Sequence, residues 1–498
     1  MNFKLSILIP ARNEEFLKQT VENLLETKNH YTEILVGLDG QLPVEPLDQH
    51  KDVTVVYFVE SIGQRAMTNR LCQLSKAKYV MKLDAHCKMD KDFDKKLIED
   101  MQDDWTVVPK MYNLHAFDWV CQSCGVRRYQ GKSGKCKCGG EEKKEIIFEA
   151  KPSPETTAMK FDTDLRFGYW GQYKKRQKGD LVETMSLLGA CWMLTREKYW
   201  ELNICDEEFG SWGQQGTEVA CKTWLSGGKL ICNKKTWFAH MFRTQGGDFG
   251  FPYGHKKGAI TKARQHSRNL FLEGKWKGKY DLNWLINKFN PPDWQGIIYY
   301  TDNQLNLKIA HKVQDRLKKM GLPIVSASLK PMNFGENYVI EGKRGNESYF
   351  KQILKALEKS KSEIIFFCEH DVLYNPTHFD FIPPKKDKFY FNTNVWKVDW
   401  ETGKALWTDN LQQVSGMVCY RDFAIEHYER KLKLVQEGKF NRRYEPETKT
   451  GLLRVSYQSK EPIYDIRHNN NLTKSRWSKD KFKNKEYTKG WKTKTIKL

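Results

Sequence analysis

Long apolar runs are missing from this sequence of 498 residues. A transmembrane helix needs roughly 18 or more consecutive apolar residues, and no such run occurs. The apolar stretch near the N-terminus, residues 5–10, is shorter than the apolar core of a signal peptide. We therefore expect a cytoplasmic protein that does not contact a membrane, and we interpret this stretch as the first β-strand.

Acidic residues are outnumbered. The chain has 62 Asp and Glu against 83 Lys and Arg, a formal net charge of +21 at pH 7. This balance favours a polyanionic partner such as nucleic acid, but a basic surface that only confers solubility explains it equally well. Aromatic residues are abundant, with 16 Trp and 22 Tyr, which is typical of a globular chain and not of a disordered one.

Apolar runs alternate with helical patterns along residues 1–110. This alternation predicts an α/β fold, a mostly parallel Rossmann-like sheet that binds its ligands at the carboxyl ends of the strands. A stretch rich in Gly, Pro and charge at 273–295 predicts a boundary, after which a second α/β pattern begins. We thus expect a first domain over 1–285, a second over 286–473 and a basic tail without regular structure over 474–498.

The apolar run at 79–83 ends on Asp84 and His86, which one residue separates. Side chains at positions i and i+2 of an extended chain point the same way, so both could bind one cation. A carboxylate with an imidazole suits Mn²⁺ better than Ca²⁺, and Mg²⁺ is the alternative cofactor. Such a cation could stabilise a diphosphate as a leaving group.

Seven short motifs follow one another in a fixed order: LSILIPARNE, EILVGLD, IGQRAMTNR, LDAHC, GACWML, WGQQGTE and HMFR. This order resembles the GT-A glycosyltransferases whose sequences begin Ile-Pro-x-x-Asn-Glu, and most of all the catalytic domains of polypeptide N-acetylgalactosaminyltransferases. The resemblance covers residues 4–275. It implies a GT-A domain that moves a sugar from a nucleotide sugar, expected to be a UDP-sugar, to a hydroxyl group.

The resemblance also implies site residues, each of which could instead be structural. It implies that Asp84, His86 and His240 bind the metal ion. The other implied residues are nucleotide contacts at Arg12, Glu14 and Asp39, phosphate contacts at Gly63 and Arg65, acceptor-side residues at Trp212 and Glu218, and Arg243 at the start of a lid.

The place of a general base is empty in this chain. Inverting relatives carry Glu-Asp-x-Glu at the turn, and the Asp takes the acceptor proton. Gln215 and Gly216 stand at the Glu and Asp positions here. The N-acetylgalactosaminyltransferases that the chain resembles are retaining and also lack this Asp, so we predict retention; if the enzyme inverts, Glu218 is the candidate base.

Four of the 12 cysteines cluster within an insertion at 119–140. Cys121, Cys124, Cys136 and Cys138 form two close pairs, each followed by a glycine, which predicts a structural Zn²⁺ site. Disulfides are the alternative, but a cytoplasmic protein disfavours them. The basic residues around the cluster could contact nucleic acid. Alternatively, this zinc knuckle, the four cysteines with their intervening residues, could serve only to stiffen an insertion beside the acceptor.

The second α/β pattern echoes the first. The segment EIIFFCEHD ends at Asp371 as YVMKLDAH ends at His86, and His468 in IYDIRHNNN has a rough counterpart in His240. We interpret the second domain as another GT-A-like copy with Asp371 and His468 as ligands of a second Mn²⁺, which would let it add a second sugar. A degenerate copy kept for packing is the alternative.

The acceptor is predicted from charge and from the zinc knuckle. These features favour DNA that carries hydroxymethylated pyrimidines, the acceptor of virus-encoded glycosyltransferases such as those of bacteriophages, with a flipped base in an aromatic cleft. The alternatives are a protein Ser or Thr hydroxyl, a surface polysaccharide, or a non-catalytic zinc protein that binds nucleic acid on a transferase scaffold.

Overall fold

The computed structural model of the chain describes residues 3–29, 31–153, 156–242, 258–407, 411–440, 453–468 and 492–497. The chain divides into two compact units, Met1–Leu285 and Ile286–Leu498. Within the described part of the chain, no helix has the length and apolar character needed to cross a membrane. The predicted α/β architecture, with one sheet-based unit followed by another, is confirmed.

The first unit contains one large sheet. Its main strands are β1 (Leu5–Ala11), β2 (Thr32–Asp39), β3 (Val53–Phe58), β4 (Tyr79–Leu83), β6 (Trp105–Cys121), β11 (Leu181–Glu183), β12 (Cys191–Thr195) and β13 (Lys229–His240). They lie in the order β11-β13-β6-β12-β4-β1-β2-β3, and the short β5 (Cys87–Met89) pairs with β13. Strands β3, β2, β1 and β4 are parallel, so their carboxyl ends share one edge, as the sequence predicts.

Helices cover this sheet through their buried side chains. In α1 (Leu17–Thr27), Leu17, Val21 and Leu24 recur at helical spacing and pack on the buried strands β1, β2 and β4. The other helices of the unit are α2 (Gln64–Leu74), α3 (Phe93–Glu99), α4 (Arg196–Glu201), α5 (Gln215–Leu225) and α6 (Ala259–Ser267), and α7 (Leu282–Phe289) crosses the division between the units. A small separate sheet pairs β9 (Met159–Phe161) with β10 (Phe167–Tyr169).

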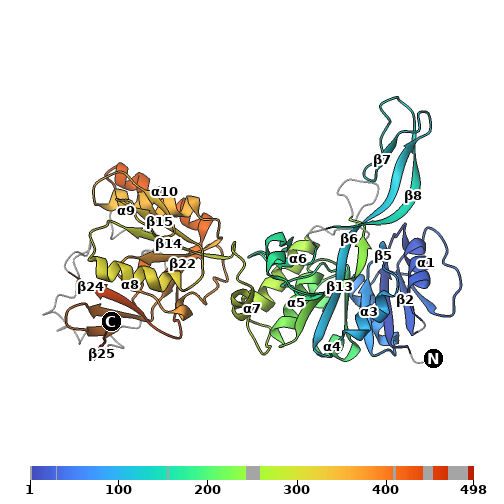
Figure 1. The fold of residues 1–498 in the computed structure, drawn as a ribbon, viewed down its shortest axis with the longest axis horizontal. Helices are drawn as coiled ribbons and strands as arrows, with labels where there is room; N and C mark the ends of the chain where they lie inside the picture. The colour runs from blue at the N-terminus through green and yellow to red at the C-terminus, as the bar shows by residue number, and fades with distance from the viewer. Residues whose placement is uncertain are drawn as a thin grey trace. The chain divides into compact units, whose positions relative to one another are not determined.

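Strand β6 is long enough to leave the sheet. It continues for 17 residues and forms an antiparallel arm with β8 (Glu142–Lys151) and β7 (Arg127–Tyr129), seen projecting from the body of the unit in Figure 1. Phe117, Trp119 and Phe148 form an apolar cluster with Phe16 at the base of the arm. The cysteine-rich insertion is therefore the tip of a β-hairpin that the sheet itself supports.

The second unit also contains a mostly parallel sheet. Its strands are β14 (Gln295–Thr301), β15 (Ile324–Ser328), β16 (Glu336–Val339), β17 (Ile364–Glu369), β19 (Phe389–Asn392), β22 (Met417–Tyr420) and β23 (Arg454–Tyr457), in the order β16-β15-β14-β17-β22-β19-β23. The helices of this unit are α8 (Leu307–Lys318), α9 (Asn346–Lys359) and α10 (Arg421–Gln436).

The two sheets have the same topology. In each, four parallel strands are followed by an antiparallel strand (β12 or β22), a further antiparallel neighbour (β6 or β19) and a strand parallel to that neighbour (β13 or β23). The first strands, β1 and β14, each have seven residues, and Asn13 and Asn303 two residues beyond them both have a positive φ, 51° and 59°. The second unit thus repeats the sheet of the first.

A second sheet in this unit corrects one expectation. Its strands lie in the order β18 (Val372–Leu373), β24 (Ile463–Arg467), β20 (Val395–Asp399), β21 (Lys404–Trp407) and β25 (Lys492–Thr495). Residues 474–498 were expected to form a tail without regular structure, but β25 within them pairs antiparallel with β21. Backbone pairing needs no apolar periodicity, so the basic composition concealed this strand.

Candidate active site

Asp84, His86 and His240 converge at the carboxyl edge of the first sheet. Asp84 directly follows β4, His86 directly precedes β5, and His240 ends β13, where it lies opposite Cys87. The Oδ2 atom of Asp84 is 3.3 Å from Nε2 of His240 and 3.9 Å from Nε2 of His86. One ligand atom from each residue lies within 4.8 Å of the others, so all three can reach one ion.

The surroundings hold these side chains in the forms that bind a metal. The carboxylate of Glu14 is 3.0 Å from Nδ1 of His86, which orients the ring with Nε2 toward Asp84. Burial lowers the pKa of His240 to about 4, so this imidazole is neutral at pH 7. Burial acts to raise the pKa of Asp84, but the ammonium group of Lys82 and the hydrogen bond with His240 outweigh it and hold the pKa well below its usual range.

Lys82 is a site residue that the sequence analysis missed. Its side chain is fully buried, donates to the carbonyl of Gly189 at 2.8 Å and forms an ion pair with Asp84. A charged residue inside the apolar strand YVMKL was the signal, because a buried lysine needs a specific anionic partner. Its role is to compensate the partly buried carboxylate of the cluster.

A cavity of about 610 Å³ opens beside the three residues. Trp212, one of the predicted acceptor-side residues, lines it. So do Gln64, which lies within the motif IGQRAMTNR, and Arg166 and Arg264, which lie outside the seven motifs. The two arginines bring positive charge to a cavity that would have to accommodate a diphosphate.

Three residues that were predicted to contact the sugar nucleotide, Arg12, Asp39 and Gly63, are joined by hydrogen bonds at the turn before α2. Asp39 is fully buried, and its carboxylate accepts from the backbone N–H groups of Ile62 at 2.7 Å and Gly63 at 3.0 Å and from the hydroxyl of Ser61. Arg12 donates to the carbonyl of Asp39 at 2.9 Å. The carboxylate of Asp39 therefore stabilises the turn before α2, and contact of Arg12 and Gly63 with a nucleotide stays a prediction.

Two further predicted residues pair with each other in the structure, and their predicted roles stay untested. Arg65 was expected to contact phosphate and Glu218 to be a candidate base, but they form a buried ion pair with Nη2 and Oε2 3.1 Å apart. Arg65 is 1% exposed and Glu218 is 0% exposed, and neither lines the cavity. Glu218 also pairs with Lys222 at 3.0 Å, so its charge is already compensated on both sides. Arg243 and its lid lie outside the described residues.

The four knuckle cysteines come together at the tip of the arm. Their Sγ atoms lie within 4.8 Å of one another, with three of the separations at 3.4–3.5 Å. Zn–S bonds of 2.3 Å in a tetrahedron would give about 3.8 Å, whereas a disulfide would need about 2.05 Å. Backbone N–H groups of Cys124 and Ser123 lower the pKa of Cys121 to about 6, which favours the thiolate. The cluster is suited to a structural Zn²⁺, which stays a prediction.

The basic surface expected on this knuckle is partly neutralised. Arg127 pairs with Glu145 at 2.5 Å, and Arg128 pairs with Glu142 at 2.5 Å. These contacts tie the hairpin together across β7 and β8. They leave less positive charge for a nucleic-acid backbone than the sequence suggested.

The second unit brings its predicted ligands together but alters one correspondence. Oδ2 of Asp371 is 3.3 Å from Nε2 of His468. The strand register, however, sets Asp465 opposite Val372, the first residue of the short strand, as His240 lies opposite Cys87 in the first unit. Asp465, and not His468, is thus the topological counterpart of His240.

Comparison with known proteins supports a glycosyltransferase. Residues 6–117 match the model of the family described as glycosyl transferase family 2. Polypeptide N-acetylgalactosaminyltransferase 3 of Homo sapiens is 27% identical over 26% of this chain and 20% of its own. The bovine (Bos taurus) polypeptide N-acetylgalactosaminyltransferase 6 is 24% identical over 54% of this chain and 42% of its own.

Two further similarities extend over more than half of the chain. The inactive polypeptide N-acetylgalactosaminyltransferase-like protein 5 of Macaca fascicularis is 22% identical over 57% of this chain and 59% of its own. A crystal structure of GalNAc-T7 with UDP, GalNAc and Mn²⁺ aligns with 18% identity and a TM-score of 0.41 over 54% of this chain and 48% of that one. The chain thus spans between a fifth and three fifths of the length of these curated relatives. Its first unit carries a GT-A-like Rossmann sheet and a match to glycosyl transferase family 2.

Proposed function

We propose that the first unit transfers a sugar from a UDP-sugar to a hydroxyl group with the help of a divalent cation, Mn²⁺ or Mg²⁺. The observation that carries this proposal is the convergence of Asp84, His86 and His240 beside a cavity of about 610 Å³. One carboxylate and two imidazoles are a donor set that suits Mn²⁺. When bound, such an ion supplies positive charge that stabilises a departing diphosphate.

The protein's own residues would prepare and position the reactants. Glu14 holds the ring of His86, and Lys82 keeps Asp84 ionised in its partly buried setting. Arg166 and Arg264 could contact the diphosphate oxygens from the cavity wall. Trp212 could form an apolar wall against the transferred sugar or the acceptor.

We propose that transfer proceeds with retention of the anomeric configuration. An inverting displacement needs a carboxylate that can take the acceptor proton. Among the described residues that line the cavity, the acids are Glu14 and Asp84, and both are engaged in the metal cluster. Glu218 is buried in ion pairs. A departing phosphate oxygen remains as the acceptor of that proton.

A protein Ser or Thr hydroxyl is the acceptor that we favour, because the curated relatives are named as polypeptide transferases. The net charge of +21 keeps hydroxymethylated DNA as the second candidate. The ion pairs of Arg127 and Arg128 argue against the knuckle as a DNA-binding surface.

A transfer assay tests these statements. The full chain, Mn²⁺ and a panel of UDP-sugars are incubated with Ser/Thr-rich peptides or with hydroxymethylated DNA, and the products are weighed by mass spectrometry. We expect labelled peptide with the native chain, no transfer with Asp84→Asn, and full activity with Asp103→Asn, whose side chain is 73% exposed. Labelled DNA and unlabelled peptide would reverse the acceptor proposal, and activity in Asp84→Asn would refute the metal site.

A further inference from the structure

The second unit has polar side chains at the same edge of its repeated sheet. In the first unit, the metal cluster occupies the connection from β4 to β5 and the end of the strand that pairs with β5. In the second unit, His370 and Asp371 form the connection from β17 to β18, and His468 directly follows β24, which pairs with β18. The fold therefore brings a second group of potential ligands to the equivalent place.

The geometry of this group matches that of the first. Ligand atoms of His370, Asp371 and His468 all lie within 4.8 Å of one another. The 3.3 Å between Asp371 and His468 equals the separation of Asp84 and His240. The hydroxyl of Thr301 is 2.5 Å from Nδ1 of His370, which fixes the ring as Glu14 fixes His86 and leaves Nε2 to face the cluster.

The neighbouring acids are held by other partners. Glu369 accepts hydrogen bonds from the hydroxyls of Tyr300 and Tyr349, each at 3.2 Å. Asp465, at the place of His240, pairs with the buried Lys397 at 2.9 Å. With Glu369 and Asp465 held in this way, His468, three residues beyond the place of Asp465, is the side chain that lies 3.3 Å from Asp371.

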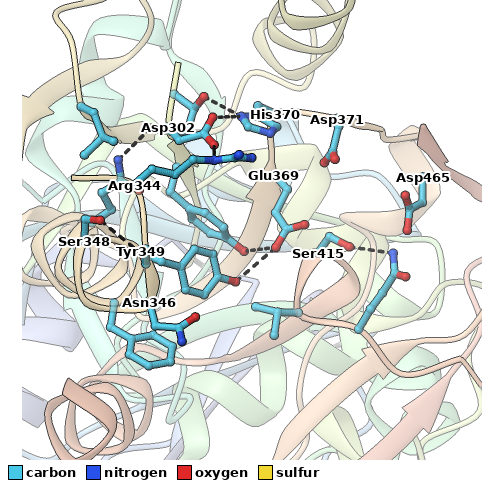
Figure 2. A pocket seen from close by; sticks show the side chains of 18 of the residues that line it. Asp302, Arg344, Asn346, Ser348, Tyr349, Glu369, His370, Asp371, Ser415 and Asp465 are labelled. Atoms are coloured by element: carbon cyan, nitrogen blue, oxygen red, sulfur yellow. Dashed lines mark hydrogen bonds and ion pairs between the residues drawn. The ribbon is translucent and has the colours of Figure 1, made fainter. Parts of the chain in front are cut away.

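A cavity of about 380 Å³ adjoins the cluster. Figure 2 shows the carboxylates of Glu369, Asp371 and Asp465 turned toward the same part of this cavity, with Arg344 on its other side. Lys431 and Arg344, whose Nε pairs with Asp302 of the same lining at 2.5 Å, contribute positive charge, and Tyr349, Phe350 and Tyr428 contribute aromatic surface. A cation site, basic side chains and aromatic rings in one cavity are complementary to a diphosphate that carries a nucleoside.

We propose that the second unit binds a divalent cation through His370, Asp371 and His468, and a nucleoside diphosphate, free or as a nucleotide sugar, in the adjoining cavity. This site is independent of the proposed transferase centre in the first unit. Its donor set, one carboxylate and two imidazoles, is the same as that of the first cluster, so both should take Mn²⁺.

Counting bound Mn²⁺ tests the cation site. The zinc-replete full chain is titrated with Mn²⁺ in the presence of UDP, and the free ion is followed by electron paramagnetic resonance. We expect two bound ions in the native chain, one in Asp84→Ala/His86→Ala, one in Asp371→Asn, and none when these changes are combined. Asp387→Asn, which changes an exposed acid of the same unit, should retain both ions.

The outcome separates this proposal from the transferase proposal. If Asp84→Ala/His86→Ala binds no Mn²⁺ while circular dichroism shows that it is folded, the second site does not exist. If Asp371→Asn removes no ion, the site is not where we assign it. If the native chain binds one ion and Asp371→Asn abolishes it, the second site stands and the first fails.

Calorimetry in the Asp84→Ala/His86→Ala background tests the nucleotide. UDP, GDP, ADP and UDP-sugars are titrated with and without Mn²⁺. We expect at least one of them to bind in a Mn²⁺-dependent manner and to lose more than about tenfold in affinity on Arg344→Gln or His468→Gln. Tighter binding of a UDP-sugar than of UDP would identify a donor site. Absence of nucleotide binding, or binding unaffected by Asp371→Asn, would overturn the proposal.

Discussion

The buried ion pair of Arg65 and Glu218 yields a prediction that separates structural from catalytic roles. Glu218→Gln removes one charge and leaves Arg65, 1% exposed, and Lys222, fully buried, with less compensation. Breaking a buried pair from one side typically costs about 3–5 kcal/mol. For a unit of this size, that loss corresponds to a fall of roughly 6–20 °C in the midpoint of the first unit's thermal transition. Differential scanning calorimetry of the full chain would measure it.

A paired substitution isolates the charge effect. Arg65→Met combined with Glu218→Leu removes both partners, and we expect it to recover part of the stability lost in Glu218→Gln, because Arg65 is no longer an uncompensated charge while Lys222 keeps its contact with Asp206 at 3.7 Å. If Glu218 were instead the general base, Glu218→Gln would keep the native midpoint and lose about 10²–10⁴-fold in kcat. That combination of results would refute the structural assignment.

Three other changes have calculable consequences. Glu14→Gln should weaken Mn²⁺ binding about 10–100-fold, measured by titration, while activity returns at saturating Mn²⁺, because the carboxylate only orients His86. Cys136→Ser should release one Zn²⁺ per chain by elemental analysis and make the arm tip sensitive to protease, with transferase activity of the first unit as the control. Burial lowers the pKa of His378 from 6.5 to about 3, so its stabilising contribution is present above pH 6.5 and is lost as the pH falls toward 3. Lowering the pH from 7 to 5 should therefore reduce the free energy of unfolding by about 2 kcal/mol. Urea unfolding of His378→Gln should show that this part of the pH dependence has disappeared. Proton NMR of the first-formed product should show the anomeric configuration of the donor; the opposite configuration would contradict retention.

The sequence predicted the positions of those site residues that follow directly from the parallel sheet. A parallel sheet places the carboxyl ends of its strands together, so Asp84 and His86 could be assigned to one site from the apolar run before them. His240 lies 154 positions further along, and only the resemblance in motif order linked it to them. The same logic identified the edge of the second sheet where Asp371 lies.

Ion pairs between residues far apart in the sequence could not be predicted from the pattern of apolar and polar residues. Arg65 and Glu218 are 153 residues apart, and α5 is buried on all sides, so no amphipathic pattern showed which way Glu218 points. The sequence similarity between the two halves matches His240 with another histidine, His468, whereas the strand register places Asp465 at the position of His240.

The use of His468 instead of the residue at the place of His240 has a physical reason. Lys82 lies within β4 and compensates Asp84 from inside the first sheet, so the histidine at the end of β13 can remain neutral and bind a cation. In the second unit the strand equivalent to β4 is apolar, and the compensating lysine, Lys397, comes from β20 and pairs with Asp465. Asp465 pairs with two cationic side chains, Lys397 at 2.9 Å and Arg467 at 3.2 Å, whereas Asp84 pairs with the single lysine Lys82, so less of the charge of Asp465 is left for a metal ion. The next side chain on that strand end able to reach Asp371 is His468. A repeated sheet can thus bring potential ligands to one edge while different residues supply them, because the backbone determines where strand ends meet and local ion pairs determine which side chains are left to bind.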